Sequence, residues 1–292
     1  TTALARMADP KMLRVRLGIA EIDSYNMLFY SHYLRYNERA ANSCLSPESS
    51  SAVLCRVCLA KYMSSVRWND TVDIRTTAVV EPSAEGQSVQ GECTLLHEWF
   101  VAEQYEKPAY LSLCTYAVCG PAGFTGARTP DAKEARRIQA LQREAGVLFT
   151  PQGGSGCSET LCVYPDMIGP GGGLAVPCVM DLFERQRTSL IGGQGELERL
   201  KAEEGTLIVV YMIQALELPP ASAVRAREEI DVTTGFTLQG DGLFYCVKQR
   251  VTHRPTGRLC AEGYLKLCFV RDGAACKAPA ATLRRLGVST SK

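Results

Sequence analysis

Alternating apolar and polar residues predict a strand near the beginning of the chain and a helix after it. Over residues 12–22 the apolar side chains fall on every second position, at Leu13, Val15, Leu17 and Ile19, which is typical of a strand with one buried face. Over residues 28–45 they recur at helical spacing instead, at Leu28, Tyr33, Tyr36 and Ala40, and give a broad apolar face. A short strand followed by a long, half-buried helix is therefore expected.

The segment after this helix reads as a series of strands. Strand-like runs cover residues 71–80, 88–96 and 109–118, and a further strand with less defined ends is expected within 54–68. Residues 120–156 then break the pattern, because glycine and proline mark both ends of this run and a charged, amphipathic surface helix is expected at 131–145. We interpret the run as a linker.

After the linker the same order of elements returns. A short strand is expected at 160–164, an apolar helix at 174–191, and further strands at 206–218, 229–238, 243–252 and 263–270. Short stretches also match residue by residue: Val66–Thr77 with Val224–Gly235, Tyr110–Cys114 with Tyr264–Cys268, and Glu38–Arg39 with Glu184–Arg185. Collinear matches on elements in the same order indicate an internal duplication.

The duplication predicts two domains of the same architecture. We expect a first domain over residues 1–120, a linker with the surface helix over 121–156, and a second domain over 157–292. A long helix followed by antiparallel strands packs best when the sheet wraps the helix and buries its apolar face. The predicted fold class is therefore α+β, with one antiparallel sheet around one central helix in each half.

Composition and charge exclude several classes of function. The 292 residues are 46% apolar and carry a net charge of +1, so a substantial core is feasible and no nucleic-acid partner is expected. No apolar run approaches the ~20 residues that span a bilayer. The chain has 13 cysteines, an odd number, mostly within strand-like or helix-like runs. This usage favours unpaired thiols in a reducing, intracellular compartment, either cytoplasmic or organellar.

A metal site has little support in the sequence. Cys55-Arg-Val-Cys58 is the one C-x-x-C motif, and the chain has 3 histidines. A zinc site normally needs a second pair of ligands at a similar spacing. We therefore expect no metal ion.

The residues best suited to catalysis lie between the first predicted strand and the first predicted helix. Asp23 follows the apolar run and precedes an aromatic segment that contains Phe29, Tyr30 and Tyr33. In one interpretation this aspartate is an ordinary helix cap. In the other, its carboxylate lies beside the N–H donors and partial positive charge of a helix N-terminus, where a reacting carbonyl group is stabilised.

This segment resembles the active-site region of the 4-hydroxybenzoyl-CoA thioesterase-like hotdog proteins. In that family an Asp is followed by a loop, by Phe-Tyr, by Tyr, by Arg with an aromatic residue, and usually by Glu-Arg-Ala. The corresponding residues here are Asp23, Phe29-Tyr30, Tyr33, Arg35-Tyr36 and Glu38-Arg39-Ala40. The resemblance covers both halves, although the first half alone carries the full motif, and it implies a tandem hotdog fold.

The resemblance also implies an activity, the hydrolysis of an acyl-CoA thioester to a free acid and CoA. CoA is then part of the substrate, and no further cofactor is expected. Asp23 takes the role of general base or nucleophile, and the backbone N–H of Tyr30 takes the oxyanion role. Asn26, Phe29 and Tyr33 are expected next to the substrate. Many family members have glycine at the position of Asn26, so the loop is expected to differ there.

Other functions stay open, because hotdog folds host several of them. One alternative is a non-catalytic protein that binds acyl thioesters or acyl carriers, and another is an acyl-ACP thioesterase. The expected partner is an acyl-CoA substrate, and a homo-oligomer of double-hotdog chains is an additional expectation.

The second half offers a weaker version of the same entrance. Asp166 aligns with Asp23, and Gly169 then restores the family's glycine, so both are candidates for a second site. This alignment makes the loop about three residues longer through Pro170–Gly173 and replaces Phe-Tyr by Leu174-Ala175. The second entrance is therefore interpreted either as decayed or as binding another part of the ligand.

Overall fold

The computed structural model divides the chain into two compact units. The described residues are 12–23, 25–45, 47, 49–79, 92–102, 104–119, 124, 127–147, 157–169, 171–219, 223–239 and 243–285. The first unit comprises Thr1–Val53 and Met63–Gln139, and the second comprises Leu54–Tyr62 and Ala140–Lys292. These units are defined by contacts in space. The domain boundaries predicted from the sequence, with a linker over 121–156, stay a prediction.

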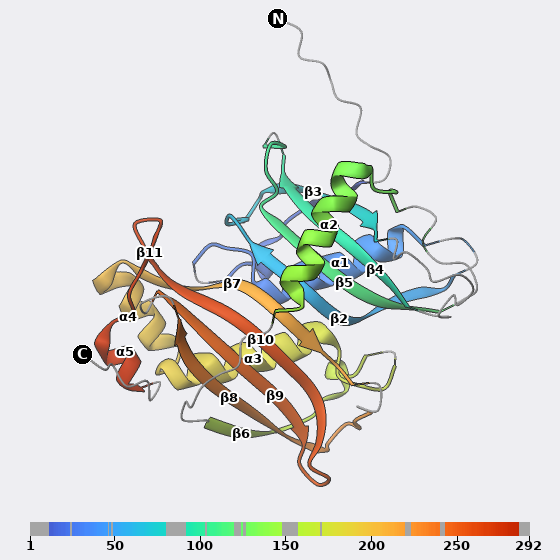
Figure 1. The fold of residues 1–292 in the computed structure, drawn as a ribbon. Coiled ribbons are helices and arrows are strands. Elements are labelled where there is room, and N and C mark those ends of the chain that lie inside the picture. The colour runs from blue at the N-terminus through green and yellow to red at the C-terminus, as the bar shows by residue number, and fades with distance from the viewer. Residues whose placement is uncertain are drawn as a thin grey trace, which may run out of the picture. The chain divides into compact units, whose positions relative to one another are not determined.

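In the first unit an antiparallel sheet packs against one long helix (Figure 1). The strands pair in the order β1 (Met12–Arg16), β3 (Thr71–Ala78), β4 (Glu92–Val101) and β5 (Tyr110–Cys119). The helix α1 (Tyr30–Ser43) is two residues shorter at each end than the predicted helix over 28–45. The strand predicted over 12–22 is too long, because it ends at Arg16 and Ile19–Glu21 form a short 3₁₀ helix, η1, with Ile19 exposed.

Asn37 joins α1 to the sheet through a buried polar cluster. Its Nδ2 donates to the hydroxyl of Tyr110 at 3.1 Å and to that of Ser112 at 3.0 Å, while Trp99 Nε1 donates to its Oδ1 at 2.9 Å. All of these side chains are buried. Because a buried polar group is costly without a partner, the cluster fixes how α1 is rotated against β4 and β5.

We expect Asn37→Ala to lower the free energy of unfolding by about 3 kcal/mol, since the indole N–H and two hydroxyl groups lose this partner in the core. Urea unfolding followed by circular dichroism measures the loss. Arg39→Gln, at an exposed position of the same helix, is the control and should change stability by less than about 0.5 kcal/mol. Equal stability of Asn37→Ala and wild type would contradict this account of the core.

The second unit has the larger sheet. Residues Arg56–Lys61 of β2 (Ser51–Tyr62) pair with β7 (Thr206–Glu217). The sheet continues through β10 (Arg258–Arg271), β9 (Phe244–His253), β8 (Glu229–Gln239) and β6 (Cys157–Cys162), and β11 (Ala274–Cys276) pairs with β10. The helix α3 (Val176–Ile191) packs against this sheet, as α1 does in the first unit (Figure 1). The short helix α5 (Ala280–Arg285) follows β11.

The helix α3 is less apolar than predicted, because it buries Gln186 and Arg187. Arg187 Nη2 donates to Glu184 Oε2 at 2.8 Å, and its Nη1 donates to Gln249 Oε1. Gln249 in turn donates to Thr234 Oγ1 at 2.7 Å. The second core therefore places a charged group among hydrogen-bonding partners, as a buried guanidinium requires.

The two units repeat the same backbone pattern up to the first long helix. Leu17 N–H donates to Asp70 O at 3.1 Å, and Val163 N–H, 146 positions later, donates to Glu228 O at 2.9 Å. α1 and α3 begin at the same spacing, and η2 (Pro165–Met167) occupies the place of η1. The duplication predicted from the sequence therefore extends to the hydrogen bonds.

One of the sequence matches used for the duplication is wrong in register. His97 of β4 lies opposite Thr76 on one side and Ser112 on the other. Gln249 of β9 lies opposite Thr234, the counterpart of Thr76, on one side and Gly263 on the other, so it takes the place of His97. Ser112 therefore corresponds to Gly263 and not to Lys266, as the alignment of Tyr110–Cys114 with Tyr264–Cys268 requires. The alignment is out by three residues, an odd shift that places every side chain on the wrong face.

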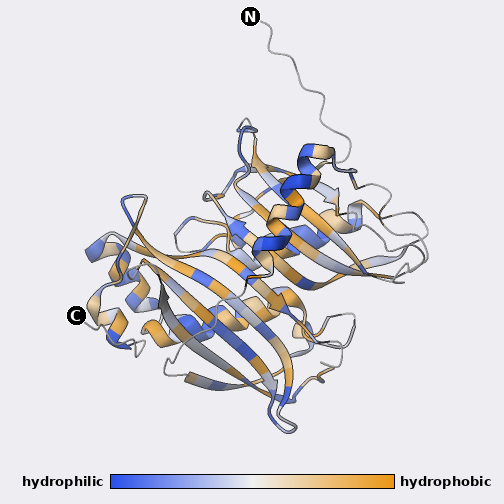
Figure 2. Cartoon of the chain, viewed as in Figure 1, coloured by the Kyte–Doolittle hydropathy of each residue, from blue (hydrophilic) through white to orange (hydrophobic). Residues whose placement is uncertain are grey.

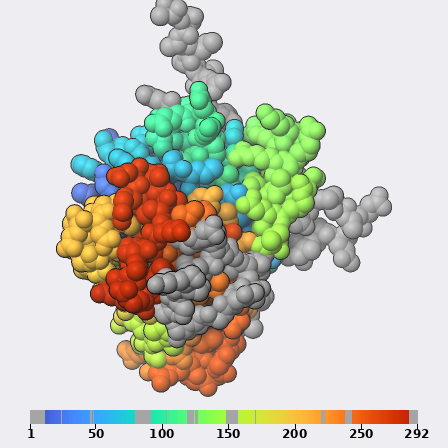
Figure 3. Space-filling model, turned by 60° about the vertical axis from the view of Figure 1, so that its left-hand side comes forward, coloured from blue at the N-terminus to red at the C-terminus, as the bar shows by residue number. Residues whose placement is uncertain are grey.

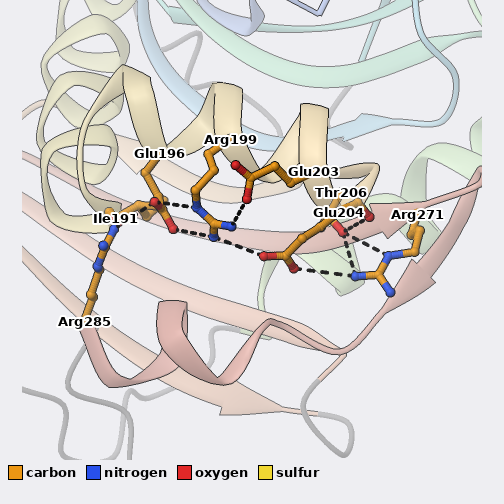
Figure 4. Close-up of polar contacts among 8 residues, drawn as sticks. All are labelled: Ile191, Glu196, Arg199, Glu203, Glu204, Thr206, Arg271 and Arg285. Atoms are coloured by element: carbon orange, nitrogen blue, oxygen red, sulfur yellow. Dashed lines mark hydrogen bonds and ion pairs between the residues drawn. The ribbon is translucent and has the colours of Figure 1, made fainter.

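The helix α4 (Gln194–Glu204) accounts for most of the extra length of the second unit after its central helix. Arg199 forms ion pairs with Glu196 at 2.9 Å, Glu203 at 3.0 Å and Glu204 at 3.0 Å (Figure 4). Arg285 of α5 reaches Glu196 at 3.2 Å. Figure 3 shows α4, in gold, beside the red elements near the C-terminus. Ion pairs from Arg271 of β10 and Arg285 of α5 hold α4 to these elements.

The helix α2 (Ala132–Ala145) forms where the surface helix was expected. Asp131 caps it, because its Oδ1 accepts hydrogen bonds from the N–H groups of Lys133 at 2.9 Å and Glu134 at 2.8 Å. Figure 2 shows hydrophilic and hydrophobic residues alternating along α2, and its buried side chains are Ile138 and Leu141. An otherwise polar helix is thereby anchored by a narrow apolar stripe.

Asp73 of β3 forms a two-pronged ion pair with Arg14 on the first sheet. Arg14 donates to its two carboxylate oxygens at 2.6 and 2.7 Å, and the Tyr105 hydroxyl donates to the second oxygen. The hydrogen bonds from Arg14 hold the pKa of Asp73 below its ordinary value. The resulting stabilisation is present above the pKa of an unfolded Asp and is lost as pH falls through the folded value.

We therefore expect Arg14→Gln to lower the melting temperature at neutral pH, with a difference from wild type that shrinks as pH falls below about 4. Melting curves between neutral and acidic pH measure this difference. A gap that stays constant down to acidic pH would contradict the pairing of Arg14 with ionised Asp73.

The sequence predicted unpaired cysteines and no membrane span. Every cysteine whose side chain the structure describes is a free thiol. Among the described helices, none combines the length and the apolar character needed to cross a membrane.

Candidate active site

A tight loop between η1 and α1 places Asp23 at the entrance of the helix. Asp23 N–H donates to Met27 O at 2.8 Å, and Asn26 N–H donates to Asp23 O at 3.1 Å. The carboxylate takes part as well, because its Oδ1 accepts hydrogen bonds from the N–H groups of Tyr25 at 2.8 Å and Met27 at 3.0 Å. Asp23 is therefore oriented by the backbone of its own loop.

Asn26 occupies the one described position in this loop that requires a left-handed backbone, with φ of 59°. Asparagine tolerates this conformation better than most residues other than glycine. Asparagine therefore suits this position for conformational reasons, and its side chain is exposed. An additional contact of Asn26 with a substrate stays a prediction.

The loop leads directly into the first turn of α1. Phe29 N–H donates to Glu21 O at 3.0 Å, and Tyr30 is the first residue of the helix. A backbone N–H at this position donates to no carbonyl group within the helix, and it lies at the positive end of the helix dipole. The rings of Phe29 and Tyr30 are partly exposed and lie 4.7 Å apart, so they form an aromatic edge beside the entrance.

Glu21 ties the entrance to the body of the helix. Its Oε1 accepts a hydrogen bond from the Tyr36 hydroxyl at 2.6 Å, and its Oε2 accepts one from Gly18 N–H at 2.8 Å. Burial and this bond to Glu21 raise the pKa of Tyr36 to about 12. Tyr36 is therefore a neutral hydrogen-bond donor at physiological pH, and it keeps η1 in place against α1.

Tyr33 lies deeper than a residue that only lines a surface pocket. Its ring packs 4.6 Å from that of Tyr110 and 4.8 Å from that of Trp99, and its side chain is buried. Burial raises its pKa above the ordinary value, and the charge of Asp23 contributes to the same effect. A Tyr33 contact with an acyl chain stays a prediction.

Sequence reasoning missed Ser31, the second residue of α1. Its hydroxyl is buried and makes no hydrogen bond with any residue that the structure describes. The corresponding residue of α3 is Pro177, so the fold does not require a hydroxyl there. Nothing in the hydrophobic pattern marks this serine. A buried hydroxyl without a described partner is uncommon, which makes Ser31 a candidate site residue.

The second entrance repeats the backbone of the first without a carboxylate. Gly169 N–H donates to Gly173 O at 2.8 Å, and Gly172, with φ of 76°, donates to Gly169 O at 3.0 Å. An isolated bridge joins Ile168 to Leu174, as one joins Ile22 to Leu28 in the first unit. The two loops therefore correspond residue for residue, and Gly169 takes the place of Asp23.

The predicted equivalence of Asp166 and Asp23 is consequently wrong. Asp166 lies within η2, at the place of Ala20 in η1, and its side chain is exposed. The predicted insertion through Pro170–Gly173 does not exist, because both loops have the same length between bridge and helix. A second site that uses Asp166 and Gly169 stays a prediction.

The candidate residues fall into two groups. Asp23, Asn26, Phe29, Tyr30 and Tyr33 lie together on the loop and first turn of α1 in the first unit. Asp166 and Gly169 belong to the second unit. In the described part of the chain, no cluster of three or more His, Cys, Asp or Glu residues is arranged to hold a metal ion.

Comparison with known proteins supports the fold. No family model matches the sequence, and no curated protein is a significant match. Among solved structures the chain is similar to a protein assigned as an oleoyl thioesterase from Lactobacillus plantarum, with 7% identity, a TM-score of 0.59, and coverage of 88% of this chain and 93% of that chain. It is also similar to the 12:0-ACP thioesterase of Umbellularia californica, with 7% identity, a TM-score of 0.57, and coverage of 88% and 94%.

An acyl-ACP thioesterase from Bacteroides thetaiotaomicron shows the same likeness, with 10% identity, a TM-score of 0.52, and coverage of 88% of this chain and 98% of that chain. These alignments span most of both chains, so they concern both units. The chain therefore has the tandem hotdog fold, with an antiparallel sheet around a long helix in each unit. The fold predicted from the Asp23 segment is confirmed.

We expect Asn26→Gly to keep the melting temperature of wild type, because glycine adopts the left-handed conformation readily. Asn26→Val should lose about 1–2 kcal/mol of stability, because a β-branched residue is strained at this φ. Thermal unfolding of the two variants side by side measures the difference. Equal stability of the two variants would show that the loop does not hold Asn26 in this conformation.

Proposed function

We propose that the first unit hydrolyses an acyl thioester at the entrance formed by Asp23 and the start of α1. The observation that carries the proposal is the contrast between the two entrances. The second loop makes the same backbone hydrogen bonds with Gly169 where the first has Asp23. The loop can therefore form without a carboxylate, and Asp23 is best explained by a chemical role.

In the proposed reaction Asp23 activates a water molecule. The water oxygen forms the bond to the thioester carbonyl carbon while Asp23 takes one of the water protons. The carbon–sulfur bond then breaks, and the proton passes to the leaving sulfur, which gives a free acid and a thiol. In the nucleophilic version of this role, an Asp23 carboxylate oxygen bonds to the same carbon and the carbon–sulfur bond breaks to release the thiolate. Water then hydrolyses the resulting anhydride, which gives the free acid and restores the Asp23 carboxylate.

The start of α1 is positioned to stabilise the negative charge that develops on the carbonyl oxygen. The backbone N–H of Tyr30 is the proposed donor, supported by the positive end of the helix dipole. The buried Ser31 hydroxyl is a second candidate donor. A donor of this kind typically contributes ~3 kcal/mol to the transition state. The aromatic edge of Phe29 and Tyr30 is suited to shield the acyl group from water.

The carrier of the acyl group is proposed to be coenzyme A, with no metal ion and no further cofactor. An acyl carrier protein is the alternative, and it is supported by the names of two similar structures, the 12:0-ACP thioesterase and the acyl-ACP thioesterase. An exposed tryptophan in the first unit, Trp68, favours coenzyme A, which carries an adenine nucleotide.

A non-catalytic acyl-thioester binding protein is the second candidate function. It is favoured by the use of Asp23 Oδ1 as an acceptor for two backbone N–H groups, since this is what a purely structural aspartate does. Substitution by asparagine separates the two roles, because the amide oxygen still accepts these bonds and the amide no longer accepts a proton from water.

We expect Asp23→Asn to fold like wild type and to lower kcat by roughly 10²–10⁴-fold, the usual contribution of a general base. The assay measures thiol release from short, long and aromatic acyl-CoA substrates. Asp131→Asn is the matched control, because Asp131 Oδ1 also accepts two backbone N–H bonds and lies at the cap of α2. The control should hydrolyse at the wild-type rate.

Absence of thiol release by wild type with any acyl-CoA or acyl carrier substrate would favour the binding protein. Equal rates for wild type and Asp23→Asn would remove Asp23 from the chemistry even if the protein is a hydrolase.

A further inference from the structure

A second feature of the first unit is a rigid turn that exposes a tryptophan. The turn covers Arg67–Asp70, in which Asp70 N–H donates to Arg67 O at 3.2 Å and Arg67 N–H donates to Asp70 Oδ2 at 2.8 Å. Asn69 has the left-handed φ of 71° that the turn needs. Trp68, held between them, is 54% exposed.

The second unit shows that this turn does not need a tryptophan. Its counterpart covers Arg225–Glu228, in which Glu228 N–H donates to Arg225 O at 3.2 Å and Arg225 N–H donates to Glu228 Oε2 at 2.7 Å. Arg227 has the matching left-handed φ of 72°. Ala226 occupies the place of Trp68. The same turn therefore forms with alanine, and the indole has no structural function there.

Two arginines stand beside Trp68. Arg16 Nε donates to Asn69 Oδ1 at 2.9 Å, so its guanidinium is fixed against the turn. Arg67 is exposed, and neither arginine forms an ion pair with a described acidic residue. The place of Arg16 in the second unit is taken by Cys162. The second unit keeps an arginine in the turn, Arg225, but it lacks the indole and the fixed arginine, so the pair of Trp68 with Arg16 is specific to the first unit.

The turn is directly connected to the proposed catalytic entrance. Val66 O accepts a hydrogen bond from Leu28 N–H at 2.7 Å, and Ser65 Oγ donates to Met27 Sδ at 3.1 Å. Residues 65 and 66 therefore hold the end of the Asp23 loop, and the chain reaches Trp68 two residues later. Asp23, Trp68 and Arg16 occur together in the first unit, and the second unit has Gly169, Ala226 and Cys162 instead.

We propose that Trp68, with Arg16 and Arg67, binds the adenine nucleotide of a coenzyme A thioester whose acyl carbon lies at Asp23. The inference rests on the proposed function and names the carrier that this site accepts. An indole face stacks on a base irrespective of its identity. Guanidinium groups recognise phosphate with paired, charge-assisted hydrogen bonds. An acyl carrier protein lacks the adenine, so it leaves Trp68 unexplained.

The test measures binding without hydrolysis, by fluorescence titration with CoA and with adenosine 3′,5′-bisphosphate. The chain has 2 tryptophans, and Trp99 is fully buried, so a ligand that contacts Trp68 changes the signal of the exposed indole. Wild type should show saturable quenching with both ligands. Trp68→Ala, which copies the second unit, should weaken CoA binding about tenfold by calorimetry, whereas Trp68→Phe should retain most of the affinity.

Controls and kinetics separate this site from the catalytic claim. Tyr164→Ala removes an exposed aromatic ring of the second unit and should leave CoA binding unchanged. With acyl-CoA, Trp68→Ala should raise KM about tenfold at unchanged kcat, and with an acyl-pantetheine thioester, which lacks the nucleotide, KM should equal that of wild type.

Equal CoA affinity of wild type and Trp68→Ala would overturn the proposal, as would failure of wild type to bind CoA while it hydrolyses acyl carrier protein thioesters. Loss of binding to phosphatidylcholine vesicles in Trp68→Ala, with CoA affinity unchanged, would assign the indole to a lipid surface instead. If wild type binds CoA through Trp68 but hydrolyses no thioester, the nucleotide site stands and the hydrolase proposal fails.

Discussion

The orientation of the Asp23 carboxylate in the proposed site depends on the hydrogen bonds that it makes with its own loop. One carboxylate oxygen accepts two backbone N–H groups of the loop that leads into the first turn of α1. This arrangement limits how the carboxylate is oriented, and it sets the carboxylate next to the positive end of the helix. Glu21 and Tyr36 secure the other side of the loop, so the entrance is fixed from two directions.

The duplicated fold provides an internal reference for deciding which residues the architecture requires. The second unit builds the same loop with glycines and the same turn with Ala226, and it begins its helix with Val176-Pro177 in place of Tyr30-Ser31. Features found in both units are explained by the fold. Asp23, Ser31, Arg16 and Trp68 belong to the first unit alone. The shared fold does not account for these four residues, and for this reason the proposed reaction and ligand are assigned to the first unit.

Much of the architecture could be predicted from the sequence, because period-two and helical spacing are strong signals where one face is buried. The position of Asn26 was also identifiable as unusual, and its left-handed backbone explains why. Other features had no local signal. Ser31 looks like any polar helix residue, and its burial follows from packing. The polar core around Asn37 depends on partners more than sixty positions away.

Two alignment errors have physical causes. The glycines at 171–173 were interpreted as an insertion. Asp23 was aligned with Asp166 because both are carboxylates, three residues before its true counterpart, Gly169. The match between Tyr110–Cys114 and Tyr264–Cys268 was misleading because apolar strands resemble one another at several registers, and the backbone pairing alone fixes the register. In both places, similar side chains suggested an alignment that the backbone hydrogen bonds contradict.

We propose that the thioester carbonyl binds at the start of α1, beside Asp23. A crystal structure with an acyl-CoA analogue in which a methylene group replaces the sulfur tests it most directly. The account predicts the analogue's carbonyl oxygen within hydrogen-bond distance of the Tyr30 N–H, with the Asp23 carboxylate facing the carbonyl carbon. A carbonyl bound instead at the start of α3, next to Gly169 and Val176, would contradict it.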